Sequence, residues 1–256
     1  MFKSSILLVV SLSLLTGCFP FGGNEDSRKL VANGLSPKAL YDLAKVKAEA
    51  GSTDQAIEKF ELILASYPAS KFAIQARLDI AYQLFKRKKY NLAILELDEF
   101  IQKYPNLPST PYAYYLKGVI AEKKSSSILD RVVTDSAQRD VESVREAYLY
   151  FIQLIEAYPD SKYSLDASQK LTKLTNTLAR HELYVAMYYA QIGSYIASIN
   201  RSKYIIEKYP NSSSIPDALN LMADNYDEIN MNNFASDARK ILSSSYPSYS
   251  PNYSIK

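Results

Sequence analysis

"QLIEAYPDS" (residues 153–161) is one of five related stretches in this chain of 256 residues. The others are "LILASYPAS" (62–70), "EFIQKYPNL" (99–107), "YIIEKYPNS" (204–212) and "ILSSSYPSY" (241–249). Each contains an apolar segment that closes on Tyr-Pro. Proline lacks an amide hydrogen and disfavours helical backbone at the preceding residue, so each Tyr-Pro predicts the end of a helix. Successive prolines lie 37, 54, 51 and 37 residues apart, which indicates an irregular repeat.

Three positions before each proline recur in kind. The residue twelve positions before it is small, being Ala56, Ala93, Ala147, Ser198 or Ala235. Eight positions before it stand Phe60, Leu97, Phe151, Ser202 and Arg239, and five before it stand Ile63, Phe100, Leu154, Ile205 and Leu242. This spacing resembles the second helix of the tetratricopeptide repeat, in which a small residue lets two helices approach closely and a large one fills the gap between neighbouring pairs.

The first helix of each pair is predicted just upstream, at residues 39–51, 76–90, 111–123, 181–193 and 217–229. Short turns such as "GST", "KKY", "GSY" and "MNN" connect the two predicted helices and suit antiparallel partners. The predicted fold class is therefore all-α, a superhelical α-solenoid of about five irregular tetratricopeptide-type helix pairs over residues 36–247.

Two departures from the repeat period indicate how the chain is organised. About 17 residues are extra between Gly118 and Ala147, which predicts an insertion within residues 122–140. After Pro159, a long helix is predicted to run into the fourth pair, because apolar residues recur at helical spacing at Leu165, Leu171, Leu174 and Leu178. We expect residues 36–160 to hold the first three repeats and residues 161–256 a linking helix with the last two.

The amino terminus has the features of a bacterial lipoprotein signal. Lys3 precedes an apolar run from Ile6 to Leu15, which is too short to span a bilayer, and "LTGC" then ends at Cys18, the only cysteine of the chain. The motif resembles a lipobox, which implies a signal peptide at 1–17, acylation of Cys18 (palmitate among its lipids) and a flexible tether at 18–35. Several acyl chains suffice for stable anchoring, and Phe19 favours the outer membrane, periplasmic face, over retention in the inner membrane.

Composition argues against most catalytic and nucleic-acid functions. Lys and Arg number 30 against 27 Asp and Glu, with no basic block, so no nucleic-acid partner is expected. The single histidine, His181, lies in a helical pattern, and no phosphate-binding glycine motif occurs. We therefore expect a non-enzymatic protein with no metal and no cofactor besides the lipid on Cys18. A hydrolase with paired carboxylates remains an alternative, and it would need such a pair in a deep cleft.

The whole mature chain resembles the BamD family, the tetratricopeptide-repeat lipoproteins of the outer-membrane β-barrel assembly machinery. The resemblance is strongest in "FIQLIEAYPDSKY" (151–163), "LARHELYVAMYY" (178–189) and "NRSKYIIEKYP" (200–210). It departs from the family in the insertion, where Asp130-Arg131 and Arg139-Asp140 match only loosely, and at Ser198, where alanine is usual. The resemblance implies a scaffold that binds the periplasmic domains of BamA through its C-terminal repeats, accessory Bam lipoproteins elsewhere, and the C-terminal segments of unfolded outer-membrane proteins through its N-terminal repeats.

Positions 2, 5, 9 and 12 of the first helices are expected to line the concave face. Over the first three repeats these positions include an aromatic set, namely Tyr41, Tyr82, Phe85, Tyr112 and Tyr115. Tyrosine offers a large contact area and a hydroxyl group, which suits an extended peptide that ends in an aromatic residue. The alternative is that these rings fill the core between repeats.

A partner interface is expected in the fourth repeat. Arg201 matches an arginine of the family motif and is the first candidate for contact with BamA; Lys203 and Arg180 are further candidates. The alternatives are that these are solvated charges or that Arg201 braces the fourth helix pair. A different tetratricopeptide lipoprotein, for example a periplasmic adaptor that coordinates cell-wall synthesis, would share the repeats without needing this insertion pattern.

Overall fold

The protein is a chain of helix pairs. The structure is a computed structural model that describes residues 34–127 and 141–251, and within these residues it contains ten α-helices and no strand. Repeat 1 is α2 (Pro37–Glu49) and α3 (Thr53–Ser66), repeat 2 is α4 (Lys71–Lys86) and α5 (Tyr90–Lys103), repeat 3 is α6 (Thr110–Ser127) and α7 (Glu142–Ala157), repeat 4 is α8 (Ser164–Gln191) and α9 (Tyr195–Lys208), and repeat 5 is α10 (Ile215–Glu228) and α11 (Asn232–Ser245).

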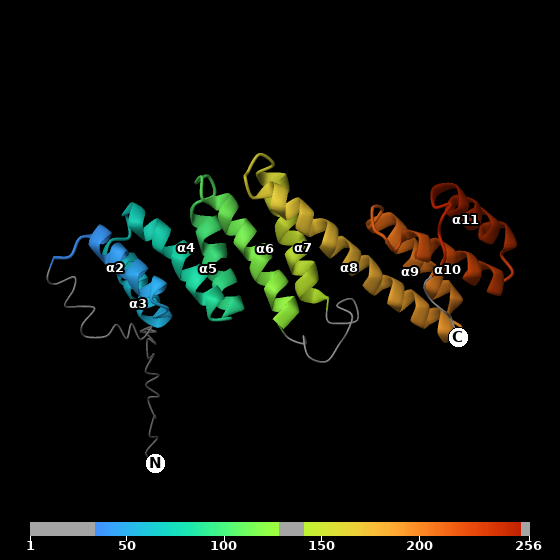
Figure 1. Cartoon of the computed structure of the whole chain (residues 1–256), viewed down its shortest axis with the longest axis horizontal. Helices are drawn as coiled ribbons and strands as arrows, with labels where there is room; N and C mark the ends of the chain where they lie inside the picture. The colour runs from blue at the N-terminus through green and yellow to red at the C-terminus, as the bar shows by residue number, and fades with distance from the viewer. Residues whose placement is uncertain (1–33, 128–140, 252–256) are drawn as a thin grey trace, which may run out of the picture.

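The pairs are stacked into an elongated solenoid. Each helix packs mainly against its neighbours in sequence, and α2 and α11 lie at opposite ends of the molecule (Figure 1). Because the main contacts of each described repeat are with adjacent repeats, the array has no single central core and its apolar interior continues from pair to pair. The predicted all-α solenoid of five helix pairs is confirmed.

The Tyr-Pro dipeptides end the second helix of every pair, as predicted. The tyrosines at these positions are the C-cap residues, with φ between −128° and −140°, and each donates its backbone N–H to the carbonyl four residues before it. The following proline cannot extend the helix because it has no N–H to donate.

The turns inside the pairs depend on one residue with positive φ. Gly51 and Gly193 have φ of 76° and 75°, which costs glycine little. In the equivalent turns of repeats 2 and 5 this position is occupied by Lys88 and Asn230, each with φ of 59°. The turn geometry is therefore retained in repeat 2 even though lysine is strained in this region.

The repeat positions found in the sequence are core positions. The small residues twelve positions before each proline, from Ala56 to Ala235, are all fully buried. Eight positions before the proline, Phe60, Leu97 and Phe151 are fully buried. Arg239 of α11 is half-exposed there, because α11 is the last helix of the described array. Two helices also approach closely at Gly118, where an added Cβ would lie 2.4 Å from Cε1 of Phe151.

The long helix predicted after Pro159 is α8, which has 28 residues. Leu174 and Leu178 are buried in it as expected, but Leu165 is 72% exposed, because Ser164 and Ala167 are the buried residues of its first turn. One apolar cluster extends from α2 to α6 and a second from α6 to α11. The division at residue 160 stays a prediction.

Candidate functional site

A groove of about 580 Å³ lies along the first helices of repeats 1 to 3. Its lining comes from α2, α4 and α6, from the turn at Pro108 and Ser109, and from Lys162 and Tyr163 just before α8. We call it the concave groove. Helix positions expected to face this side contribute Lys45, Gln75, Leu78, Tyr82 and Tyr112. The groove thus joins side chains that are far apart in the sequence.

One part of the concave groove is aromatic. Tyr82 is 41% exposed, and the rings of Tyr112 and Tyr163 lie 5.6 Å apart between centroids. Tyr163 also stacks on Tyr115 at 5.2 Å with an interplanar angle of 26°. Sequence reasoning missed Tyr163, although it closes the segment with the strongest family resemblance, directly after the third Tyr-Pro turn.

Another part of the concave groove is charged. The carboxylate of Asp79 accepts a hydrogen bond of 2.6 Å from the Tyr41 hydroxyl, and its second oxygen lies 3.7 Å from Nζ of Lys45. Lys162 adds a second ammonium group, 5.0 Å from the ring centroid of Tyr163. The groove therefore offers tyrosine rings, two cations and one carboxylate to a ligand.

The five predicted aromatic residues divide between lining and support. Tyr82 and Tyr112 line the concave groove. Tyr41 reaches it only through Asp79, because its ring packs against core phenylalanines at 5.6 and 5.5 Å. Phe85 packs between Tyr82 and Tyr90 at 6.3 and 6.2 Å and does not line the groove.

Tyr115 supports the groove from behind. Its ring packs on Phe151 and on Tyr163, and its hydroxyl donates a 2.6 Å hydrogen bond to Asp166 at the start of α8. This contact ties α6 to α8 and holds Tyr163 in place. Peptide binding by all five aromatic residues stays a prediction.

Burial keeps these phenols protonated. Burial, reinforced by nearby tyrosines and Asp79, raises the pKa of Tyr112 to about 12. The pKa of Tyr41 and of Tyr115 is also raised, first by burial and then by the hydrogen bonds to Asp79 and Asp166. Each phenol is therefore a neutral hydrogen-bond donor across the ordinary pH range.

Arg201, the first candidate for a partner interface, is engaged within its own repeat. Its Nη1 donates to Oε2 of Glu182 at 2.8 Å; the glutamate side chain is 8% exposed and the arginine side chain 44%. The same two repeat positions are occupied in repeat 2 by Arg77 and Glu96, which pair at 3.0 Å with the charges reversed. This recurrence supports the alternative in which Arg201 braces the fourth pair.

Lys203 and Arg180 lie on the surface of repeat 4. Lys203 of α9 is exposed, and its Nζ lies 5.9 Å from the ring centroid of Tyr226 on α10. Arg180 is exposed on α8. Contact of Arg201, Lys203 or Arg180 with a partner stays a prediction.

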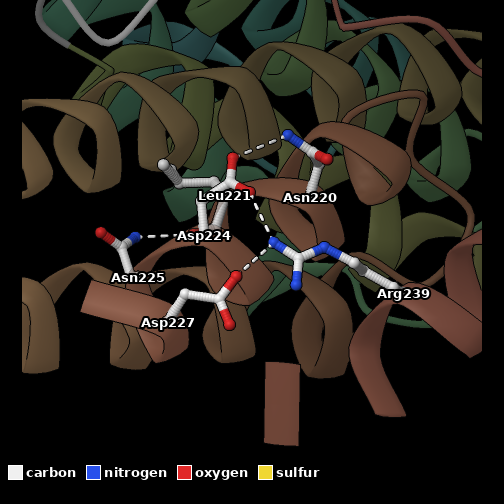
Figure 2. Close-up of polar contacts among 6 residues, drawn as sticks. All are labelled: Asn220, Leu221, Asp224, Asn225, Asp227 and Arg239. Carbon is white, nitrogen blue, oxygen red and sulfur yellow. Dashed lines mark hydrogen bonds and ion pairs between the residues drawn. The ribbon is translucent and has the colours of Figure 1, made fainter. Parts of the chain in front are cut away.

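Ion pairs hold the two helices of repeat 5 together. Nη2 of Arg239 lies 3.1 Å from Asp224 and 2.6 Å from Asp227, so one guanidinium of α11 bridges two carboxylates of α10 (Figure 2). Burial raises the pKa of Asp224, and Arg239 opposes that rise. These two neighbouring carboxylates are therefore engaged in a structural ion pair.

Buried hydrogen bonds accompany the serine that replaces alanine in repeat 4. Ser198 donates to the carbonyl of Ala186 at 2.7 Å and accepts a 2.8 Å bond from Nδ2 of Asn225. Nδ2 of Asn225 also donates to the carbonyl of Leu221, the bond drawn in Figure 2. Ser198 and Asn225 are 0% and 2% exposed. The chain thus compensates the departure at Ser198 with an amide from the next repeat.

Several predicted features lie outside the described residues. They include Cys18, the signal peptide, most of the tether and residues 128–140 of the insertion. Among the helices of the part described, none is both long enough and apolar enough to cross a membrane. In the same part, no group of three or more His, Cys, Asp or Glu side chains is placed to hold a metal ion.

Comparison with known proteins gives one consistent family. The YfiO family model, described as an outer membrane lipoprotein, matches residues 34–241. Outer membrane protein assembly factor BamD of Neisseria gonorrhoeae is 31% identical over 94% of this chain and 91% of that protein. BamD of Haemophilus influenzae is 31% identical over 94% of this chain and 89% of that protein, and BamD of Xylella fastidiosa strain 9a5c is 29% identical over 95% and 82%.

Among solved structures, a tetratricopeptide repeat protein from Parabacteroides merdae aligns with a TM-score of 0.41 and 16% identity, over 84% of this chain and 68% of that one. At this TM-score the alignment carries no argument about function.

Proposed function

Because this chain belongs to the YfiO family of outer membrane lipoproteins, whose relatives include BamD assembly factors, we propose that it is a non-enzymatic scaffold for outer-membrane protein assembly. In this proposal the concave groove receives C-terminal segments of unfolded outer-membrane proteins. The C-terminal repeats bind the periplasmic domains of BamA, and accessory Bam lipoproteins bind elsewhere. The family of adaptors for cell-wall synthesis is not favoured by these relatives.

The concave groove is the observation that carries the proposed peptide binding. Tyr82, Tyr112 and Tyr163 provide a surface for an aromatic side chain, and the hydroxyl of Tyr112 supplies a hydrogen-bond donor. Lys45 and Lys162 provide positive charge for a terminal carboxylate. An extended peptide that ends in phenylalanine presents both groups at one end.

Peptide binding is tested with a fluorescent peptide that has the C-terminal sequence of an outer-membrane β-barrel protein and ends in phenylalanine with a free carboxylate. We expect Tyr82→Ser to raise the Kd about three- to tenfold, the effect of one lost aromatic contact. Tyr188→Ser is the matched control, because Tyr188 is a 58% exposed tyrosine of α8 outside the groove. Equal Kd values for both variants and the unmodified chain would remove the peptide from the concave groove.

The carboxylate contact is tested with the same peptide carrying a C-terminal amide. The amide removes the negative charge that Lys45 and Lys162 are proposed to meet, so it should bind more weakly. The double variant Lys45→Gln/Lys162→Gln should lose this discrimination between the two peptides. A peptide amide that binds as well as the acid would leave the aromatic contact as the only recognised feature.

Scaffolding is tested by affinity purification of the tagged lipoprotein from outer membranes. BamA should be recovered with it, and failure to recover BamA would overturn the proposed scaffold role. The anchor is tested by Cys18→Ala, which should release the protein from outer membranes into the soluble fraction if acylated Cys18 holds it at their periplasmic face.

A further inference from the structure

A second groove lies on repeats 1 and 2 and shares no lining residue with the concave groove. It has a volume of about 500 Å³ and runs between α3 and α5 over α4. We call it the α3/α5 groove. Each wall presents residues along about two turns of a helix, from Asp54 to Glu61 on α3 and from Lys89 to Glu96 at α5, which corresponds to about 10 Å of helix.

The floor and one wall of the α3/α5 groove are apolar. Ile80 and Leu84 of α4 lie beneath it and are 2% and 8% exposed. Above them, Leu92 and Leu95 of α5 remain 50% and 53% exposed, although they are spaced to share one helix face. Two half-exposed leucines beside a groove form an apolar surface available to a partner.

The rim carries carboxylates on both walls, three on α3 and Glu96 on α5, and one cation, Lys89, at the start of α5. Glu58 lies 3.6 Å from Lys59 and Glu96 lies 3.0 Å from Arg77, so both have a cation nearby. Asp54 pairs with Arg87. Glu61 has no such partner among the described residues, and burial together with the charge of Glu58 raises its pKa.

The next junction along the chain shows what completes this position. Asp98 stands seven residues before Pro105, as Glu61 stands seven before Pro68. Asp98 is paired with the ammonium group of Lys117, and the ring of Tyr150 lies 4.1 Å from that Nζ. The structure therefore contains one filled example of this carboxylate position.

The α3/α5 groove lacks both completing groups. Ile80 occupies the position of Lys117, twelve residues after the preceding proline, and Glu96 occupies the position of Tyr150, nine residues before the following one. Where Asp98 has the ammonium group of Lys117, Glu61 has the apolar side chain of Ile80. Where Asp98 has the ring of Tyr150 nearby, Glu61 has a second carboxylate, Glu96. Glu61 is therefore an exposed carboxylate next to Glu58 and Glu96, and unlike these two it has no ion-pair partner among the described residues.

We propose that the α3/α5 groove binds an amphipathic helix of a partner protein, which packs apolar side chains on Leu92 and Leu95 and places a lysine or arginine against Glu61. The carboxylate rim selects a basic helix over an acidic one by charge complementarity. The walls are helices with no free backbone edge, which favours a helix in the groove over an added strand. The cation of the partner forms an ion pair with Glu61, as Lys117 does with Asp98.

The proposal is tested with a synthetic helical peptide of leucine and lysine, leucines at positions i, i+3, i+4 and i+7, and fluorescence anisotropy on the full mature chain. Glu61→Gln and Leu95→Ser should each raise its Kd about three- to tenfold. The matched controls are Glu207→Gln on α9 and Leu165→Ser on α8, both at exposed positions away from the groove, and should change it less than twofold. The same peptide with glutamate for lysine should not bind, and added salt should weaken binding of the lysine peptide.

Equal effects of the groove variants and their controls would overturn the proposal, because the peptide would then bind only by general attraction. Tyr82→Ser in the concave groove should leave this Kd unchanged, so failure here is distinguishable from failure of the proposed peptide site. All these positions are exposed, and unchanged melting temperatures check that the variants are folded.

The natural occupant is tested in cells with a photoreactive amino acid in place of Leu95. Mass spectrometry of the cross-linked peptide should find a helical segment of another protein with Lys or Arg within two turns of apolar residues. A cross-link to a second copy of this chain or to an acidic or extended segment would contradict the proposal. No cross-link from Leu95, when the same label at Tyr82 cross-links, would contradict it as well.

Discussion

Reversing the charge of Arg201 separates bracing of repeat 4 from contact with BamA. Arg201→Glu places a carboxylate against Glu182, whose side chain is 8% exposed and whose present partner is 2.8 Å away. Loss of the partner of a buried charged group costs about 1–3 kcal/mol. Because the arginine side chain is 44% exposed, water reduces the cost of the added like charge, and we expect a total loss of about 2–4 kcal/mol in unfolding free energy.

The matched variant exchanges both residues. Glu182→Arg/Arg201→Glu recreates the polarity of Arg77 and Glu96, which pair at 3.0 Å in repeat 2. It should regain most of the lost stability, with a coupling free energy of about 1–3 kcal/mol in a double-mutant cycle measured by urea unfolding. A single Arg201→Glu variant as stable as the unmodified chain would refute the brace.

BamA recovery from outer membranes then decides the second role. If Arg201 acts only within repeat 4, the exchanged variant recovers BamA as well as the unmodified chain does. If its guanidinium contacts BamA, the exchanged variant is stable but recovers less. Lys203→Glu is the parallel test on α9, because Lys203 is exposed and its removal breaks no ion pair with Glu182.

Three further predictions concern stability. Gly118→Ala should lower the unfolding free energy by up to about 2 kcal/mol, since the new Cβ meets Phe151 at 2.4 Å and overpacking outweighs the gain in helix propensity; Phe151→Leu in the same chain should restore part of the loss in urea unfolding. Lys88→Gly should raise the unfolding free energy by about 0.5–1 kcal/mol, and with it the melting temperature, because φ is 59° there. An unchanged melting temperature would show that lysine is not strained. The unfolded chain releases the Tyr112 proton near pH 10 and the folded chain near pH 12, so the unfolding free energy should fall as pH rises through this window. The unfolding free energy of Tyr112→Phe should fall less steeply. Identical pH profiles for the variant and the unmodified chain would contradict the raised pKa of Tyr112.

The helix pairs could be predicted because the sequence repeats the physical requirements of their packing. A small residue at Ala56 and its equivalents, a large one at Phe60 and its equivalents, and a proline that ends each second helix are local requirements, readable without a structure. The starts of the first helices were less readable. α4 begins at Lys71, five residues before the predicted start, because Ser70 caps it through a hydrogen bond of its hydroxyl oxygen to the N–H of Ala73.

The concave groove could be predicted only as a surface. Helix positions placed Tyr82 and Tyr112 on one face, but whether a tyrosine lines a groove or fills the core depends on neighbours from other repeats. Tyr41 and Phe85 occupy equivalent helix positions, but their rings pack against other rings of the protein. Tyr41 contacts Phe60 and Phe72, and Phe85 contacts Tyr90. Tyr163 enters the groove from a turn, where helical spacing gives no signal.

The residues eight and twelve positions before each proline explain why the C-terminal repeats are held differently from the first three. In repeats 1 to 3 alanine and a large apolar residue fill the space between helices, so packing volume fixes the helix positions. In repeat 4 both positions are serine, and in repeat 5 the residue eight positions before the proline is Arg239. Directional bonds are made there by Ser198 with Asn225 and by Arg239 with two aspartates, whereas the buried hydroxyl of Ser202 has no hydrogen-bond partner among the described residues.

Directional bonds fix one register of helices where apolar packing would tolerate several, since an unmatched buried amide or carboxylate costs free energy. The surface formed by repeats 4 and 5 is therefore set by a few polar contacts. Ser198 and Asn225 hold the neighbouring helices α8, α9 and α10 in one relative position, which would fix the place of Lys203 for the BamA contact that we propose.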